Sequence, residues 1–477
     1  MKKLLAILLS VLLLMACVPL GAVSAAAAKS GTTGACRWTL DNSGHLTISG
    51  NGAMGNYDET YDRYSPWGTS IVSVTIEKGV TSIGNFAFSS CELLASVTIP
   101  DSVISIGEYA FIDCNSLTSM TIPDSVTSIE EEAFMRCENI VSIVIPDSVV
   151  SIGDWAFYGT AYYNDATNWE NDVLYIGNHL IEATSTLVGS YVTKNKTVTI
   201  ADYAFEDCAS LEEVIISDSI TSIGKRAFND CHSLTSITIP DSVSYIGNDA
   251  FYNTAYYNNE SNWENDVLYI GRHLINARDT LSSLYDIKDG TLTVAGDAFR
   301  DCDSLTSVTI PDSVTSISDY AFSECAALKS VIIGDSVTTI GSSAFYACYV
   351  LTSVTIPASV TTIGYDAFFW CNSLTDVYYG GSEADRENIA VDQYNDALLN
   401  ATWHYNYTPE PDITYGDANG DGSVNARDAA LLQQYIAGWD ATLDEASADA
   451  NGDGSVNARD VAMLQQYIAG WDVQLGK

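Results

Sequence analysis

Basic residues are scarce in this sequence. Its 477 residues include 20 Lys and Arg but 61 Asp and Glu, which gives a formal net charge of −41. Repulsion would oppose contact with nucleic acid or with an anionic membrane surface, so we expect neither as a partner. Hydrophobic residues nevertheless make up 47% of the chain, which argues against wholesale disorder.

Histidine and cysteine are sparse as well. The chain has only five histidines, and two of them, His179 and His273, take equivalent places in a duplicated segment, so we expect structural roles for these two. Eleven cysteines are too thinly spread to be the disulfide framework of a small secreted protein. No conventional catalytic set stands out, and paired carboxylates for glycoside cleavage stay an open alternative because 61 acids guarantee chance pairs.

Long hydrophobic runs are absent after the first 28 residues. Lys2 and Lys3 precede an apolar run from Leu4 to Val23 and then a small-residue stretch, which is the order of a secretory signal peptide. We therefore expect residues 1–28 to be removed and the mature chain to be exported and soluble. A retained membrane anchor and lipidation at Cys17 are the alternatives.

An Ala-Phe pair recurs with a step of 23 residues inside three groups. The phenylalanines are Phe88, Phe111, Phe134 and Phe157, then Phe205, Phe228 and Phe251, then Phe299, Phe322, Phe345 and Phe368. The two longer steps between groups contain similar inserts, since Ala161-Tyr-Tyr-Asn returns as Ala255-Tyr-Tyr-Asn. A fixed period in this range predicts a solenoid.

The unit that begins at Leu117 indicates how one coil folds. Leu117, Met120 and Ile122 alternate with polar residues, which predicts a half-buried strand. A Pro-Asp-Ser turn follows, and Val126 and Ile129 return the chain to the core. One coil has too few apolar side chains to offset the entropy of ordering it, so the coils must stack to fold.

Most cysteines follow the same period. Nine lie three residues after a repeat Phe: Cys91, Cys114, Cys137, Cys208, Cys231, Cys302, Cys325, Cys348 and Cys371. A position set by the repeat is a packing position, and a buried free cysteine behaves as a small hydrophobe. We expect reduced core thiols, with disulfides or a metal cluster as the alternatives.

These residues resemble the BspA-type leucine-rich repeats of bacterial surface and secreted proteins. The motif Leu-x-x-Val/Ile-x-Ile-Pro-x-x-Val-x-x-Ile-Gly-x-x-Ala-Phe-x-x-Cys carries the resemblance over residues 71–380, with inserts near 158–182 and 252–276. The resemblance implies a curved solenoid with short strands on one face. It also implies an N-terminal cap over residues 31–70 and a C-terminal cap over residues 381–407.

Two other features of this region have competing interpretations. Gly50-Asn-Gly-Ala-Met-Gly55 matches a phosphate-binding fingerprint, but the acidic segment after it lacks a helical period, so we expect a turn of the cap. The aromatic residues of the inserts could stack on sugars or form the inserts' own cores, and we expect cores. They are Tyr162, Tyr163, Trp169, Tyr256, Tyr257 and Trp263.

The strongest signal follows a short linker at residues 408–414. Residues 415–477 contain two copies of a loop with oxygen-bearing residues at positions 1, 3, 5, 7, 9 and 12 and Gly at 6, as Ca²⁺ demands of an EF-hand-type loop. The expected ligands are Asp417, Asn419, Asp421, Ser423, Asn425 and Asp428 in one copy and Asp449, Asn451, Asp453, Ser455, Asn457 and Asp460 in the other. Each serine would bind through its backbone carbonyl and each position-9 asparagine through water. Each loop runs into an amphipathic helix that ends near Gly438 or Gly470.

A loop followed by a helix, twice and with no helix before the loop, resembles a type I dockerin, the module that docks onto cohesin domains of a cellulosome scaffold. The resemblance implies two calcium ions as cofactor and a scaffoldin cohesin as partner. The family's recognition positions fall on Ala426, Arg427, Gln433 and Gln434 in one half and on Ala458, Arg459, Gln465 and Gln466 in the other.

We therefore expect a β-rich leucine-rich repeat solenoid with N- and C-terminal caps, followed by a small all-α dockerin domain with two calcium loops. The expected function is that of a secreted, non-catalytic binding protein, associated with a cellulosome at or near the cell surface. Its dockerin would bind a cohesin with calcium, and its repeat array would bind a protein or polysaccharide. A cellulosomal enzyme or accessory factor in plant polysaccharide degradation, and an adhesin or inhibitor directed at a protein, are the alternatives.

Overall fold

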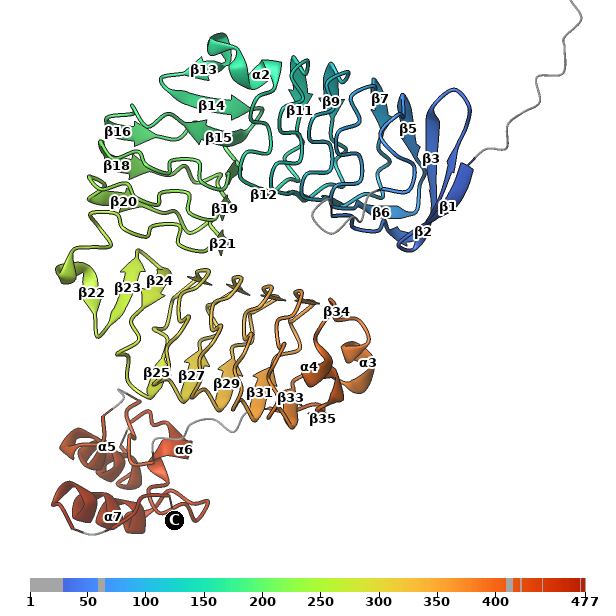
Figure 1. Ribbon diagram of the computed structural model, residues 1–477. Coiled ribbons are helices and arrows are strands. Elements are labelled where there is room, and N and C mark those ends of the chain that lie inside the picture. The colour runs from blue at the N-terminus through green and yellow to red at the C-terminus, as the bar shows by residue number, and fades with distance from the viewer. Residues whose placement is uncertain are drawn as a thin grey trace, which may run out of the picture. The chain divides into compact units, whose positions relative to one another are not determined.

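The chain forms two compact units, residues 1–406 and 407–477, in a computed structural model (Figure 1). The structure describes residues 29–58, 65–408, 415–420, 423–439, 441–471 and 473–476. The expected signal peptide, with Cys17, and most of the expected linker lie outside the described residues. Among the described residues, no helix combines the length and apolarity needed to cross a membrane.

The first unit is a stack of coils, and each regular coil contributes one strand to each of two sides. On the first side lie β5 (Ser73–Ile76), β7 (Ser96–Thr98), β9 (Ser119–Thr121), β11 (Ser142–Val144), β16 (Gly189–Val192), β18 (Leu211–Ile215), β20 (Ser236–Thr238), β25 (Leu284–Asp286), β27 (Ser307–Ile310), β29 (Ser330–Ile333), β31 (Ser353–Ile356) and β33 (Asp376–Tyr379). All of these strands except β16 and β25, which lie outside the repeat motif, are the period-two segments predicted from the sequence.

The second side carries shorter strands: β6 (Val80–Ile83), β8 (Ser105–Ile106), β10 (Ser128–Ile129), β12 (Ser151–Ile152), β17 (Thr199–Ile200), β19 (Ser222–Ile223), β21 (Tyr245–Ile246), β26 (Thr293–Val294), β28 (Ser316–Ile317), β30 (Thr339–Ile340) and β32 (Thr362–Ile363). The expected short strands on one face are present, and the second row of strands was not predicted. Neighbouring coils pair in parallel on both sides, with a register of one repeat, as in Ser128 opposite Ser105.

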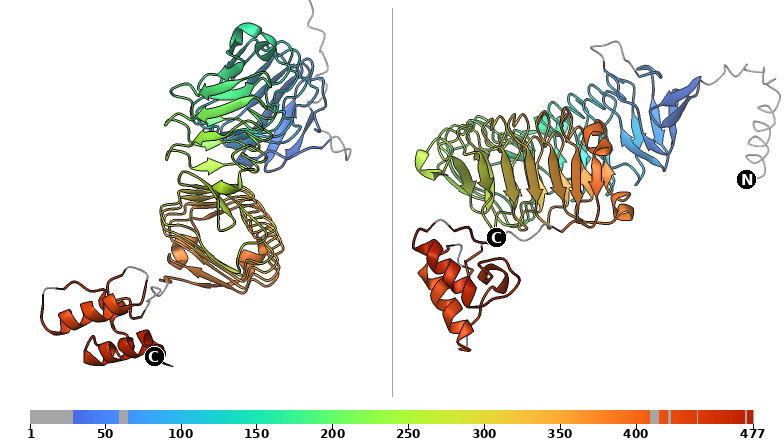
Figure 2. Two further views of the ribbon diagram at one scale, coloured as in Figure 1. Left: turned by 90° about the vertical axis from the view of Figure 1, so that its left-hand side faces the viewer. Right: turned by 90° about the horizontal axis from the view of Figure 1, so that it is seen from below.

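The interior of the stack is a continuous apolar column. In the left view of Figure 2 the last repeats are seen end-on, and each coil closes around this interior. All eleven repeat phenylalanines are fully buried, and they stack ring on ring within each group. The rings of Phe111 and Phe134, for example, lie 5.1 Å apart with 4° between their planes.

The predicted caps and inserts complete the first unit. At the N-terminus β1 (Lys29–Thr33), β2 (Cys36–Leu40) and β3 (His45–Gly50) form an antiparallel sheet that continues in parallel into β5, while β4 (Gly52–Ala53) pairs with β6. At the C-terminus lie α3 (Glu383–Arg386), β34 (Ala390–Val391), α4 (Asp396–Asn400) and β35 (Thr402–His404). Because β34 and β35 pair with β32 and β33, the cap covers the last coil.

Each insert is a small turn followed by a hairpin. The first contains α2 (Ala161–Asn164), η3 (Ala166–Asn168), β13 (Trp169–Glu170), β14 (Val173–Ile176) and β15 (His179–Ala183). The second contains η4 (Glu260–Asn262), β22 (Trp263–Glu264), β23 (Val267–Ile270) and β24 (His273–Ala277). The hairpins rejoin the stack where β15 pairs in parallel with β17 and β24 with β26.

Within its described residues, the second unit contains three helices, α5 (Ala426–Ile436), α6 (Glu445–Ala448) and α7 (Ala458–Ile468). Two of them are the predicted amphipathic helices, and α6 was not predicted. The core joins both halves, because Leu432 of α5 and Leu464 of α7 are fully buried in one apolar cluster with Ala418, Ala448 and Ala450.

Candidate metal centre and partner surface

Each long helix of the second unit begins at an asparagine of the candidate loop. The side chain of Asn425 accepts the N–H of Arg427 at 2.9 Å, and Asp428 accepts the N–H of Asn425 at 2.8 Å. Asn457 and Asp460 repeat this arrangement at the start of α7, at 3.0 Å and 2.7 Å. Both helices therefore start with a reciprocal cap, in which the last loop carboxylate is fixed by the backbone.

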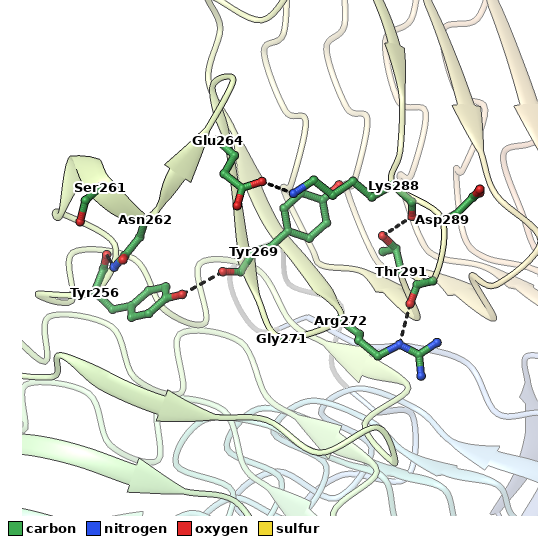
Figure 3. Close-up of a pocket in the computed structure, with 11 residues that line it drawn as sticks. Tyr256, Ser261, Asn262, Glu264, Tyr269, Gly271, Arg272, Lys288, Asp289 and Thr291 are labelled. Atoms are coloured by element: carbon green, nitrogen blue, oxygen red, sulfur yellow. Dashed lines mark hydrogen bonds and ion pairs between the residues drawn. The ribbon is translucent and has the colours of Figure 1, made fainter. Parts of the chain in front are cut away.

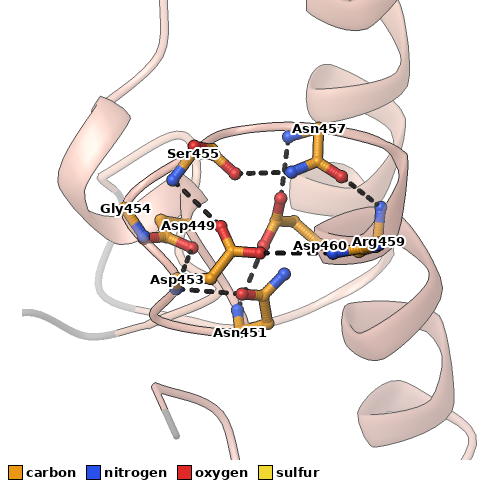
Figure 4. Close-up of polar contacts among 8 residues, drawn as sticks. All are labelled: Asp449, Asn451, Asp453, Gly454, Ser455, Asn457, Arg459 and Asp460. Carbon is orange, nitrogen blue, oxygen red and sulfur yellow. Dashed lines mark hydrogen bonds and ion pairs between the residues drawn. The ribbon is translucent and has the colours of Figure 1, made fainter.

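The second loop is described from end to end and closes around its carboxylates (Figure 4). Asp460 accepts the N–H of Asn451 at 3.1 Å with its second oxygen, so it spans the two ends of the loop. Asp449 accepts the N–H groups of Asp453 and Gly454 at 3.1 Å and 2.6 Å. The side-chain amide of Asn457 donates to the backbone carbonyl of Ser455 at 2.8 Å.

The first loop repeats this geometry wherever it is described. Asp428 accepts the N–H of Asn419 at 3.1 Å, which matches the contact between Asp460 and Asn451. Asn425 donates to the carbonyl of Ser423 at 2.8 Å, as Asn457 does to Ser455. Asp421, the expected ligand at position 5, lies outside the described residues.

The donor set of these loops fits a hard divalent cation. Asp428 and Asp460 are fully buried, Asp417 and Asp449 are nearly so, and all other expected ligands are oxygen donors. Among described residues no Lys or Arg forms an ion pair with Asp428, Asp449 or Asp460, whereas Asp453 lies 3.9 Å from Arg459. A buried carboxylate without a counter-charge is costly, and a cation bound by the loop would supply that charge.

The side chains of His, Cys, Asp and Glu would not be sufficient to bind a metal ion at these loops. Across the described ranges, no three His, Cys, Asp or Glu side chains form a group that could hold a metal ion. A calcium loop also takes ligands from side-chain amides, backbone carbonyls and water, and these are not among the His, Cys, Asp and Glu side chains considered above. The carboxylates, amides and backbone carbonyl of the second loop therefore fit the mixed oxygen donors that calcium takes.

The eight predicted partner-binding residues lie on the two long helices. Ala426, Arg427, Gln433 and Gln434 are exposed on α5, and their counterparts Ala458, Arg459 and Gln465 are exposed on α7, with Gln466 half-buried. The apolar sides of the same helices face the unit's core. Each half of the unit therefore presents a matching polar helix face.

The comparisons with known proteins match both units. Six copies of the family described as BspA type leucine rich repeat region match residues 62–188, 198–285 and 292–384, and the dockerin type I domain matches residues 415–469. The chain is a BspA-type leucine-rich repeat protein with a C-terminal type I dockerin domain. Both matched modules are non-catalytic, and together they are those of a cellulosome-type binding protein.

Solved structures similar to this repeat protein come from several bacteria. A leucine rich cell surface protein from Faecalibacterium prausnitzii is 28% identical, over 76% of this chain and 98% of that one, with a TM-score of 0.26. A leucine-rich repeat protein from Eubacterium ventriosum is 22% identical, over 80% and 85%, with a TM-score of 0.28. One from Bacteroides ovatus is 21% identical, over 79% and 99%, with a TM-score of 0.23. No curated protein matches the chain.

Inside the BspA-type repeats, the candidate residues that we expected to be structural are buried or packed. His179 and His273 are fully buried, and each ring contacts the carbonyl of a turn proline, at 3.1 Å and 3.2 Å. Trp169 donates to the carbonyl of Tyr163 at 2.8 Å, and the insert aromatics pack against the main core. The glycine-rich segment from Gly50 connects β3 to β4 as a turn of the cap.

The repeat cysteines are buried free thiols, as predicted. All ten described cysteines, the nine of the ladder and Cys36, are unpaired and buried. In the regular coils the thiol donates to the backbone carbonyl of the preceding coil's phenylalanine, as Cys137 does to Phe111 at 3.0 Å. Burial raises the pKa of Cys91 and Cys371 to about 12, so these thiols stay protonated and unreactive.

Proposed function

We propose that this chain is an exported cellulosome component whose dockerin binds a scaffoldin cohesin only when its two loops hold calcium. The observation that carries the proposal is the pair of buried carboxylates, Asp428 and Asp460, each without a basic partner among the described residues. Each carboxylate lies at the start of a helix whose exposed face carries the recognition positions. Metal in the loop would therefore fix the face that meets the cohesin.

The calcium ions would supply positive charge to loops whose own carboxylates repel one another. Asp428 and Asp460 close the two loops and, as parts of the helix caps, set the direction of α5 and α7. The polar faces at Arg427 and Arg459 are the docking surface in this proposal. Near-identity of the two halves supports docking through either helix.

The repeat array is the target-binding part in this proposal, and its target is a protein or a polysaccharide. Its eleven regular coils are accounted for by packing, and a neighbour-coupled solenoid offers a long exposed surface for recognition. Secretion through residues 1–28 would place both modules outside the cell. The attachment and the target-binding parts are thus separate units of one chain.

The experiment is a pull-down of the full chain by an immobilised type I cohesin, with calcium and with EDTA. Asp428→Ala combined with Asp460→Ala is expected to abolish capture in calcium, as EDTA does for the unchanged chain. Asp124→Ala, in an exposed turn of the array, is the control and is expected to be captured normally. Undiminished capture in EDTA would refute the calcium dependence.

A further inference from the structure

A cavity of about 400 Å³ lies between the second insert and the coil that follows it (Figure 3). This volume is in the range of small-ligand sites in proteins. Tyr256, Asn262, Glu264, Tyr269, Arg272 and Lys288 contribute to its lining. Most of these side chains are polar, and two tyrosine rings supply the apolar part.

The groups around this insert cavity are held in place by their own contacts. Tyr256 donates to the carbonyl of Tyr269 at 3.1 Å, which fixes the first ring. Lys288 forms an ion pair with Glu264 and lies 4.7 Å from the centre of the Tyr269 ring. Figure 3 shows this ion pair above Tyr269, with Asn262 on one side and Arg272 on the other.

Two hydrogen bonds hold Arg272 in place and leave other N–H donors of its guanidinium unused. Its Nε donates to the carbonyl of Gly290 at 2.8 Å, and its Nη1 donates to Asp241 at 2.8 Å. Its Nη2 makes no hydrogen bond among the described residues, and Asp289 at the rim of the cavity is exposed. The guanidinium therefore presents an oriented N–H group at a cavity whose lining also includes the carboxylate of Asp289.

The first insert has the same framework. There Tyr162 donates to the carbonyl of Tyr175 at 3.1 Å, and Lys194 pairs with Glu170 at 2.9 Å. Lys194 also lies 4.1 Å from the Tyr175 ring centre. The tyrosines and the Lys–Glu pair are thus parts of the insert fold that both copies need.

Four lining positions differ between the two inserts, and one of them is the conservative pair of Ser261 and Thr167. Arg272, Asp289 and Gly290 correspond to Asn178, Asn195 and Lys196 in the first copy. A Cβ at Gly290 would lie 3.8 Å from Nη2 of Arg272, so a lysine side chain there would start against the guanidinium. The first copy folds with Asn178, Asn195 and Lys196, so the insert fold does not require Arg272, Asp289 and Gly290. In the second copy, glycine at position 290 leaves the guanidinium of Arg272 accessible.

The charges of the lining limit the class of ligand. Arg272 and Lys288 are each paired with a carboxylate, so the cavity has no surplus positive charge for an anion. The same two cations disfavour a cationic ligand. Closely spaced donors and acceptors disfavour an apolar one, because its binding would strip water from them without replacement.

We propose that this cavity binds a segment of a neutral oligosaccharide or polysaccharide, an inference that rests on the proposal that the array is the target-binding part. Hydroxyl groups both donate and accept, which suits Nη2 of Arg272 together with Asp289 and Asn262. The rings of Tyr256 and Tyr269 would pack against the C–H face of a sugar ring.

The test is affinity electrophoresis of the full chain in calcium, in native gels that contain soluble β-glucan, xyloglucan, arabinoxylan or galactomannan. At least one of these neutral polymers is expected to retard the chain, and polygalacturonate is not. The variant with Arg272→Asn, Asp289→Asn and Gly290→Lys carries the first insert's residues and is expected to fold. It should lose about tenfold or more in affinity, because charge-assisted hydrogen bonds are removed.

Asn195→Asp in the first insert is the matched control and is expected to bind like the unchanged chain. Retardation by none of the neutral polymers, or retardation that the triple variant leaves unchanged, would overturn this inference. Stronger retardation by polygalacturonate would do the same. Capture by cohesin, measured on the same samples, is expected to survive the triple variant, so the inference and the dockerin proposal can fail separately.

Discussion

At the scale of single residues, each coil has two residues in the left-handed backbone conformation. The first lies two residues before the core Phe, and the second lies two residues after it. Asp113, Asp207, Asp230 and Asp301 take the second of these positions, with φ between 59° and 60°. Aspartate tolerates this conformation better than most residues, which explains part of the acid content of the array. Other acids are half-buried beside the inserts, where they cost stability.

Asp154 and Asp202 give the clearest pH dependence. Burial, with repulsion from neighbouring carboxylates, raises the pKa of each to about 7, whereas an unfolded Asp ionises near pH ~3.9. Between these values the folded chain keeps protons that the unfolded chain releases, so folding stability falls as the pH rises. The equivalent positions of the second copy hold Asn248 and Gly296, which carry no charge.

We therefore expect the melting temperature of the array, followed by circular dichroism in excess calcium, to fall from about pH 5 to about pH 8. Asp154→Asn combined with Asp202→Asn is expected to make this fall smaller and to raise stability at the higher pH. An unchanged pH dependence in the double variant would show that other groups control it.

At the scale of elements, the phenylalanine column is the main determinant of coil stacking. Phe322 is fully buried, and its ring lies 4.8 Å from that of Phe299 and 5.2 Å from that of Phe345. Phe322→Ala is expected to lower the free energy of unfolding by about 3–5 kcal/mol, because it removes a large core side chain and leaves a cavity. Denaturant titration would measure the loss.

The loss should also be local, since each coil contacts only its neighbours. Amide hydrogen exchange is expected to rise first near β28 and β30, and later near β8 and β10. Thr121→Ala, on the exposed side of β9, is the control and is expected to change stability by less than about 0.5 kcal/mol. A uniform rise in exchange along the whole array would contradict neighbour coupling.

The first strand of each coil could be predicted because Leu117, Met120 and Ile122 alternate with polar residues. The second strand could not be predicted, because in every coil after β6 it is only two residues long, as in Ser128–Ile129, and two residues show no period. Helix α6 is a single turn and was missed for the same reason. Tyr191 and Tyr285, whose rings pack on Phe205 and Phe299, were missed because they lie outside the repeat motif.

At the scale of the whole molecule, the repeat array and the small helical unit are two separate compact units of the chain. The loop spacing predicts the ligand types of the candidate site, since calcium loops need oxygen donors at fixed positions, and this assignment stays a prediction. The sequence did not predict that Asp428 and Asp460 both cap a helix and close a loop, because this double role depends on how the loop folds back on itself.

The most direct test of the central claim is a calorimetric titration of the metal-free full chain with calcium. We expect two calcium ions per chain and a gain of helical circular dichroism, because binding relieves the repulsion among the loop carboxylates. Asp428→Ala and Asp460→Ala are each expected to remove one ion, and Asp124→Ala none. The account would be contradicted if the intact chain took up no calcium, or if both loop variants bound as much as the unchanged chain.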